Sequence, residues 1–290
     1  MDNIHLRIAD FNIELVNRSE FPVALEEGYA DFIVPFFQAN ADVTVVVENG
    51  IPEEKKKLEN PIYSANYNGE ELWKIARTDN GLRFHVFNPD PPYALQQVAE
   101  LNSDYSVWTV YSEPRIEKDS TRLLPLLYPL GPLVMYYLTV KYDAVMLHGS
   151  GISDNGMGRI FSGVSGKGKT TMSKLWFHAG AEVLNDDRLI IRKTKSGYEV
   201  YNTPMFYQDH PRKAPLSGIY LIYHSPENTL EKLGGATAVS LLGANLIQHG
   251  YDEKIIEHHL NFLTEMVSSV PVCSLGFVPD GSVVKMIRAL

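Results

Sequence analysis

The stretch that decides the fold of this chain is Gly163-Val164-Ser165-Gly166-Lys167-Gly168-Lys169-Thr170-Thr171. It fits G-x-x-x-x-G-K-[ST], the pattern of a loop that binds nucleotide phosphates. Glycines in such a loop let backbone N–H groups turn inward toward phosphate oxygens. Lys169 supplies positive charge for the β- and γ-phosphates, and the Thr170 hydroxyl can join a Mg²⁺ shell. The sequence therefore predicts phosphate-binding residues at Gly163, Ser165, Gly166, Gly168, Lys169, Thr170 and Thr171.

The segments on either side of this loop support the same interpretation. Residues 159–162 (Arg-Ile-Phe-Ser) predict a short buried strand that enters the loop, and residues 171–179 predict a helix that leaves it. Gly180 is placed to end that helix. The order of strand, loop and helix is the one that phosphate binding requires, because the N-terminus of the helix adds the favourable end of its dipole.

Composition limits the classes of protein to consider. A chain of 290 residues, 44% of them hydrophobic, is long enough and apolar enough for one large or two ordinary packed domains. A net charge of -9 argues against a general nucleic-acid binder, which needs a clustered positive surface. Cys273 is the only cysteine, so no internal disulfide can form, and a reducing cytoplasmic location is expected.

One apolar stretch has the length of a membrane span. Residues 123–140 carry no charge after Arg122, yet Pro125, Pro129 and Pro132 are crowded into their first half. Prolines break a helix there, and lipid cannot satisfy the freed backbone groups. We therefore expect no membrane insertion, and residues 133–142 predict a core helix instead.

The first part of the chain predicts a mainly antiparallel β domain. Apolar and polar residues alternate in residues 6–15 and 43–47, and Asp79-Asn80-Gly81 between two β-prone runs indicates a hairpin. The polar, unpatterned residues 113–120 suggest the boundary. We expect a β domain over residues 1–118 and a catalytic domain with mixed strands and helices over residues 119–290. In the second domain, residues 238–249 and 253–266 have helical spacing. The predicted fold class is mixed α/β.

Two further features of the second domain carry chemistry. Asn185-Asp186-Asp187 ends a predicted strand at residues 181–184, and two adjacent carboxylates on extended backbone point to opposite sides. One can reach a metal while the other faces an acceptor hydroxyl, although Asn-Asp-Asp is also typical of a turn. His148 ends an apolar strand beside Gly149-Ser150-Gly151, where it can act as a proton shuttle, a neighbour of a metal or a structural residue.

These motifs resemble the C-terminal catalytic domain of HPr kinase/phosphorylase. They are also similar to the nucleotide-binding core of ATP-dependent phosphoenolpyruvate carboxykinase. The resemblance covers roughly residues 120–290. It rests on residues 147–151, 161–171 and 185–189. More loosely, residues 202–204, 214–216 and 270–272 resemble smaller kinase-like proteins encoded beside peptide-modification genes.

The resemblance implies ATP and Mg²⁺ as cofactors and a role for each polar residue. Asp186 would be the base that faces the acceptor hydroxyl, and Asp187 would bind Mg²⁺ together with Thr170. His148 would lie near the γ-phosphate or the metal, and Lys169 on the phosphates. Relatives carry Trp and then Gly-Glu after Thr-Pro, whereas this chain has residues 205–209 (Met-Phe-Tyr-Gln-Asp), where Asp209 is only a weak substitute.

The leading functional hypothesis is an ATP- and Mg²⁺-dependent kinase of a hydroxyl group. The acceptor would be a serine of a peptide or protein, or a small hydroxylated metabolite. The glycine-rich stretch that HPr kinases use for their protein partner is missing after Asp187, so HPr is not the expected acceptor. Two alternatives stay open. One is a carboxykinase-type lyase that would use Arg188, Arg212 and Lys213, and the other is a non-catalytic nucleotide-binding regulator. Assembly into a homo-oligomer also stays open.

Overall fold

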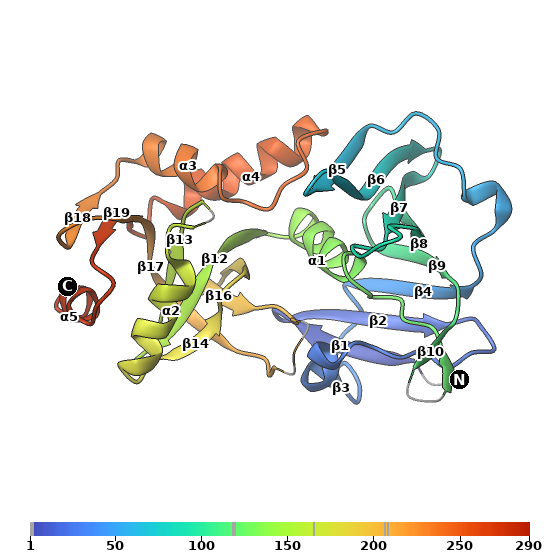
Figure 1. Cartoon of the computed structure of the whole chain (residues 1–290), viewed down its shortest axis with the longest axis horizontal. Helices are drawn as coiled ribbons and strands as arrows, with labels where there is room; N and C mark the ends of the chain where they lie inside the picture. The colour runs from blue at the N-terminus through green and yellow to red at the C-terminus, as the bar shows by residue number, and fades with distance from the viewer. Residues whose placement is uncertain (1–2, 118–119, 165, 206, 208) are drawn as a thin grey trace. The chain divides into compact units, whose positions relative to one another are not determined.

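The computed structural model describes residues 3–117, 120–164, 166–205, 207 and 209–290. Its internal contacts divide the chain into two compact units. Unit 1 comprises Met1–Lys141 and Pro204–His210, and unit 2 comprises Tyr142–Thr203 and Pro211–Leu290. Both contain large β-sheets with few helices, so the mixed α/β class is confirmed (Figure 1).

Unit 1 is built on a nine-stranded sheet in the order β3-β1-β2-β4-β9-β8-β7-β6-β5. Pairing is antiparallel except between β2 and β4 and between β4 and β9. The expected hairpin joins β6 to β7, with Thr78 opposite Gly81. The strands and short 3-10 helices are β1 (Ile4–Ile8), β2 (Phe11–Asn17), η1 (Glu27–Phe32), β3 (Ile33–Val34), β4 (Val43–Asn49), η2 (Glu53–Lys55), β5 (Tyr63–Tyr67), β6 (Glu70–Thr78), β7 (Gly81–Phe87), β8 (Leu95–Asn102) and β9 (Val107–Ser112). Two short strands, β10 (Arg115–Glu117) and β11 (Ser120–Arg122), pair with each other.

The core of unit 1 follows from the alternation along its strands. Inward residues of β2 and β4, such as Phe11, Ile13 and Val45, are completely buried. Helix α1 (Leu130–Lys141) packs on this sheet, because the Tyr137 ring meets the rings of Phe84 and Trp108 edge-on at 5.4 and 5.7 Å. A helix that is apolar on all sides needs such burial. The expected core helix is thereby confirmed, and no helix in the described part of the chain is long and apolar enough to cross a membrane.

The division between the units differs from the boundary expected at residues 118 and 119. The contacts place the chain as far as Lys141, and also Pro204–His210, with unit 1. The described strands on either side of the expected boundary, β10 and β11, pair with each other and both belong to unit 1. The difference arises because α1 completes the aromatic core under the first sheet rather than starting a new one.

Unit 2 contains eight paired strands and four helices in its described part. Strand order is β13-β12-β15-β16-β17-β19-β18, with β14 paired to β12. The strands are β12 (Ala144–Asp154), β13 (Met157–Ser162), β14 (Glu182–Asn185), β15 (Arg188–Thr194), β16 (Gly197–Asn202), β17 (Lys213–His224), β18 (Thr229–Lys232) and β19 (Val272–Phe277). The helices are α2 (Lys169–His178), α3 (Gly235–Gly243), α4 (Glu253–Met266) and α5 (Ser282–Arg288).

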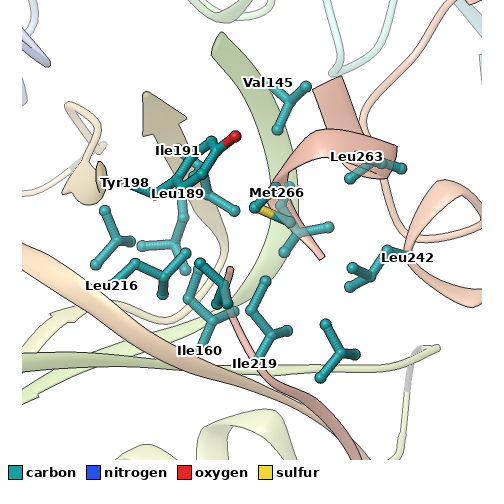
Figure 2. Close-up of a cluster of buried hydrophobic side chains, with 14 of the residues drawn as sticks. Val145, Ile160, Leu189, Ile191, Tyr198, Leu216, Ile219, Leu242, Leu263 and Met266 are labelled. Carbon is teal, nitrogen blue, oxygen red and sulfur yellow. The ribbon is translucent and has the colours of Figure 1, made fainter. Parts of the chain in front are cut away.

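An additional pairing of β13 with β17 closes five strands of unit 2 into a ring. Successive residues of these strands alternate between two cores, since neighbouring strand side chains point to opposite faces. Ile160 and Ile219 belong to one core with α3 and α4, whereas Phe161 and Tyr220 belong to another with α2 and α5. Figure 2 shows the first of these cores, with Leu263 and Met266 of α4 among the strand residues.

Strands β13, β17 and β19 run parallel to one another. Their carboxyl ends therefore meet at one edge of the sheet, and the chain leaves β13 there to form the loop before α2 (Figure 1). In parallel sheets this edge is where ligands are usually bound. The helix expected over residues 238–249 is shorter than predicted, because α3 ends at Gly243, while α4 has the bounds that its periodicity predicted.

Candidate functional site

The loop between β13 and α2 has a backbone that requires glycine. Gly166 and Gly168 have φ values of 81° and 95°, in the left-handed region that other residues avoid. At Gly168 a Cβ atom would lie 2.8 Å from the Phe277 ring. Helix α2 starts directly afterwards at Lys169. Ser165, one of the expected phosphate ligands, lies outside the described residues.

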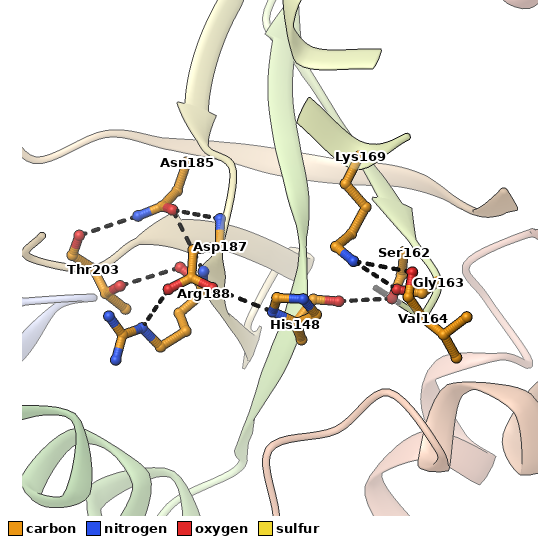
Figure 3. Close-up of polar contacts among 9 residues, drawn as sticks. All are labelled: His148, Ser162, Gly163, Val164, Lys169, Asn185, Asp187, Arg188 and Thr203. Carbon is orange, nitrogen blue, oxygen red and sulfur yellow. Dashed lines mark hydrogen bonds and ion pairs between the residues drawn. The ribbon is translucent and has the colours of Figure 1, made fainter. Parts of the chain in front are cut away.

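Lys169 closes the loop on itself. Its Nζ donates to the carbonyl oxygens of Gly163 at 2.8 Å and Val164 at 3.4 Å, as Figure 3 shows. The side chain is only 8% exposed, and this burial lowers the pKa of its ammonium group, while the charge of Asp187 acts in the opposite direction. The ammonium group thus lies over the loop and within the electrostatic reach of Asp187.

Strand β12 brings the loop and the carboxylates together. Its residue Gly149 pairs with Ser162 at the end of β13, and Gly151 pairs with Asn185 at the end of β14. Both β13 and β14 are antiparallel to β12, so their carboxyl ends lie on the same side. Residues 163 and 186, which follow these ends, therefore leave the sheet on the same side, with β12 between them, although β13 and β14 are separated in sequence by α2.

Asn185 shapes the turn that carries the two aspartates. Its side chain is buried, and its Oδ1 accepts the N–H groups of Asp187 at 2.9 Å and Arg188 at 3.4 Å. Its Nδ2 donates to the carbonyl of Thr203 at 3.2 Å, and the Thr203 hydroxyl donates to the carbonyl of Arg188 at 3.1 Å. The sequence alone did not indicate this positioning role, although the preference of Asn for such turns was the available signal.

This turn contains both Asp186 and Asp187. β14 ends at Asn185 and β15 begins at Arg188, so the two aspartates lie in a bend and not on extended backbone. The strand-based expectation that they point to opposite sides was therefore wrong in its premise, because Asn185 bends the chain. Both side chains are half-buried.

Asp187 lies between two positively polarised groups. Its Oδ1 is 3.3 Å from Nδ1 of His148, and its Oδ2 is 2.9 Å from Nε of Arg188 (Figure 3). The hydrogen bond from His148 is the main reason that the pKa of Asp187 is lowered, and the charges of Arg188 and Lys169 add to it. The carboxylate is thus kept ionised, the form in which it can bind a cation.

His148 has a firmly held backbone. Its N–H donates to the carbonyl of Asn245 at 3.0 Å, and its own carbonyl accepts the Ser162 hydroxyl at 2.8 Å. The next N–H, of Gly149, donates to the carbonyl of Asp187 at 3.0 Å. The backbone at His148 is thus held between Asn245, the end of β13 and the aspartate turn.

The remaining predicted residues lie on the first turn of α2. Thr170 is exposed, and Thr171 is half-buried. Among the residues that the structure describes, no group of three or more His, Cys, Asp and Glu side chains could hold a metal ion. A Mg²⁺ ion bound with a nucleotide needs fewer protein ligands, because phosphates and water supply the others. The Thr170 hydroxyl and an ionised Asp187 are hard oxygen ligands of the kind this ion prefers.

Other residues named from the sequence are engaged elsewhere. Arg188 pairs with Asp187, and Lys213 lies 3.6 Å from Glu199, so neither is held ready for a dicarboxylate. Asp209, the weak substitute for a family carboxylate, belongs to unit 1, where its Oδ1 accepts the N–H of His210 at 2.9 Å.

Two pairs near the loop were not predicted. A buried hydrogen bond of 2.5 Å joins the hydroxyls of Ser150 on β12 and Ser173 on α2. His224 and Phe277, from the ends of β17 and β19, contact the loop itself. No local sequence pattern marks either pair, because each is made by residues far apart in the chain.

Comparisons with known proteins give similarities to solved structures but to no family model and no curated protein. A similar solved structure is the Hpr(Ser) kinase/phosphatase from Coxiella burnetii, with 9% sequence identity and a TM-score of 0.30. The match covers 50% of this chain and 96% of that one. At this level the similarity carries no argument, and the roles proposed below rest on the residues and contacts described above.

Proposed function

We propose that this protein is an ATP- and Mg²⁺-dependent phosphotransferase that acts on a hydroxyl group. The observation that carries the proposal is geometric: the backbone carbonyl of His148 on β12 accepts the Ser162 hydroxyl at the start of the loop that Lys169 closes, and Nδ1 of His148 lies 3.3 Å from Oδ1 of Asp187. Transfer of a phosphoryl group requires such a combination of a phosphate-binding cation and a metal-binding carboxylate at one site.

The loop residues would bind the nucleotide. Backbone N–H groups of the loop and of the first turn of α2 would contact phosphate oxygens, with Gly166 and Gly168 allowing the bend. The Lys169 ammonium group would exchange the carbonyls of Gly163 and Val164 for the β- and γ-phosphates. This exchange is favourable because a phosphate bears full negative charge, whereas a carbonyl oxygen bears only a partial one.

Thr170 and Asp187 would hold the Mg²⁺ ion, which when bound would neutralise charge on the phosphate oxygens. Asp186 would accept the proton of the acceptor hydroxyl as its oxygen bonds to the γ-phosphorus, while the bond from that phosphorus to the β–γ bridging oxygen breaks and ADP leaves. His148 would orient Asp187 through their hydrogen bond and lie near the γ-phosphate. Catalysis would then depend mainly on positioning and on charge neutralisation.

The acceptor in this proposal is a serine of a peptide or protein, or a small hydroxylated metabolite. Nucleotide contacts are the same for every acceptor, so selection needs a further surface. We propose that unit 1 supplies it, because it forms a large sheet of its own that carries none of the proposed catalytic residues. An exposed strand edge, such as that of β5, is a surface to which peptides add.

The test is nucleotide turnover by the full chain with and without Mg²⁺. The chain is offered serine peptides and hydroxylated metabolites, and phosphate transfer is followed by mass spectrometry. We expect Mg²⁺-dependent transfer that is lost in Lys169→Ala and retained in Lys174→Ala, an exposed lysine on α2. Binding of ATP without any turnover would favour the non-catalytic regulator, and absence of binding would contradict the proposal as a whole.

A further inference from the structure

His224 contacts the loop from the neighbouring strand. It is the last residue of β17, and its Nε2 lies 3.3 Å from the carbonyl oxygen of Gly166. A carbonyl oxygen can only accept a hydrogen bond, so Nε2 must carry the proton and donate it. The histidine side chain is otherwise exposed, which means that it does not serve the hydrophobic core.

The peptide unit between Gly166 and Lys167 is fixed at both of its polar ends. Its carbonyl is held by His224, and its N–H, which belongs to Lys167, donates across the loop to the carbonyl of Val164 at 3.3 Å. The C=O and N–H bonds of a planar trans peptide point in opposite directions. By holding the carbonyl outward, His224 therefore directs the Lys167 N–H toward the inside of the loop.

Phe277 holds the histidine in place. The two rings lie 5.6 Å apart with an interplanar angle of 31°, and Phe277 is fully buried. The same phenylalanine limits the space at Gly168, where a Cβ would come within 2.8 Å of its ring and 3.4 Å of the His224 ring. The residues at the carboxyl ends of β17 and β19 thus pack against the loop at Gly166 and Gly168.

We propose that His224 is a positioning residue for phosphate binding. It keeps the Lys167 amide aimed at the place where a phosphate oxygen would replace the Val164 carbonyl as its acceptor. This inference rests on the proposed function, since it assumes that the loop binds phosphates. It predicts that His224 acts on the phosphate part of the ligand and leaves contacts with the nucleoside unchanged.

The experiment measures binding of Mg²⁺-ATP and of Mg²⁺-pyrophosphate by calorimetry in the full chain. His224→Ala removes the ring and the donor, His224→Phe keeps an aromatic ring against Phe277 without the donor, and His224→Gln keeps a donor. His178→Ala is the matched control, because this exposed histidine lies at the other end of α2. Thermal unfolding of each variant shows whether the fold is retained.

We expect His224→Ala and His224→Phe to weaken both ligands by the same factor, roughly three- to tenfold, the size of one lost hydrogen bond. His224→Gln should recover part of the loss, and His178→Ala should bind as the unchanged chain does. Unchanged affinity in His224→Phe would overturn the inference. Weaker binding of ATP alone would also overturn it, because His224 would then contact the nucleoside. If the unchanged chain binds neither ligand, the proposed function fails, and the inference fails with it.

Discussion

Nδ1 of His148 lies 3.3 Å from Oδ1 of Asp187, although the two residues come from different parts of unit 2. His148 belongs to β12, and Asp187 to the turn between β14 and β15. β12 pairs with β15 over one half of its length and with β13 and β14 over the other. His148 lies where the pairing changes, so its side chain reaches the aspartate turn while its backbone carbonyl is bonded to the strand that enters the loop.

Lys169→Ala should weaken ATP binding without unfolding the chain. The variant loses a charge-assisted contact worth about 1.5–3 kcal/mol, which corresponds to a roughly ten- to hundredfold increase in Kd. The fold should be retained because the contacts of Nζ are confined to the loop carbonyls. Calorimetric titration measures the affinity, with Lys174→Ala as the control. Unchanged affinity in a folded Lys169→Ala protein would mean that the loop does not bind phosphate.

Asp186→Asn and Asp187→Asn should have different effects. Asp187→Asn removes the charge that we assign to Mg²⁺, so the gain in ATP affinity that Mg²⁺ provides should disappear. Asp186→Asn should leave that gain intact and slow transfer by about 10²–10⁴-fold, the usual contribution of a general base. Binding with and without Mg²⁺ and single-turnover transfer rates distinguish the two. If both variants lose the Mg²⁺ effect equally, the division of roles is wrong.

Asp154→Asn should lower the stability of unit 2. Asp154 is 4% exposed, accepts two hydrogen bonds from Arg288 at 2.6 and 3.1 Å, and lies 3.6 Å from Arg159. The guanidinium groups of Arg159 and Arg288 both lie over the ring of Trp176. The arrangement ties α5 to β12 and α2. Because Arg288 is partly exposed, we expect the free energy of unfolding to fall by about 1.5 kcal/mol, the lower end of the range for hydrogen bonds to charged groups.

The same carboxylate gives a pH dependence with a defined sign. The hydrogen bonds from Arg288 lower the pKa of Asp154 in the folded state. Its stabilisation is therefore present above the ordinary range of an aspartate and is lost as the pH falls through the lowered pKa. Urea unfolding at neutral and acidic pH measures the free energy of unfolding. Acidification should lower this free energy less in Asp154→Asn than in the unchanged chain. Glu257→Gln, an exposed residue of α4, should behave as the unchanged chain does; equal behaviour of both variants would contradict the prediction.

Two buried histidines should make the chain sensitive to mild acid. Burial lowers the pKa of His249 to about 3 and that of His259 to about 4, from an ordinary value of 6.5. Between pH 6.5 and 4 the unfolded chain binds protons that the folded chain does not. Stability should thus fall as the pH falls, by about 1.4 kcal/mol per pH unit for each histidine.

The histidine prediction is tested through the slope of stability against pH, which separates titration from packing effects. His259→Gln should have a shallower slope between pH 6.5 and 5 than the unchanged chain, whatever its stability at pH 8. His178→Gln alters an exposed histidine of α2 and should keep the full slope. A slope in His259→Gln as steep as in the control would show that His259 is protonated in the folded state.

A truncated chain that begins at Asp119 should aggregate. It would retain α1 but lose the sheet that carries Phe84 and Trp108. The rings of these two residues pack against Tyr137 of α1. A chain that begins at Tyr142 lacks α1 and should remain monodisperse to a greater extent. Light scattering after purification compares the two. If the longer chain is no more prone to aggregation, α1 does not depend on the first sheet in the way described.

The local parts of this structure were predictable from the sequence. Glycines at positions 166 and 168 indicated a bent loop, Asp79-Asn80-Gly81 indicated a hairpin, and the spacing of residues 253–266 indicated the bounds of α4. These features depend on the conformational limits of a few consecutive residues. Strand β8 was missed, because residues on both of its faces are buried and the alternation that marks a half-exposed strand is lost.

The assembly of the site was decided only by the tertiary structure. The sequence indicated the residues His148, Lys169 and Asp187 but not their contacts, which depend on the change of partners along β12. It left a strand and a turn open for the two aspartates, and the hydrogen bonds of the buried Asn185 side chain form the turn. It gave no sign of His224. Short-range patterns record the stiffness of the backbone and the burial of single elements, whereas the pairing of distant strands depends on the packing of the whole unit.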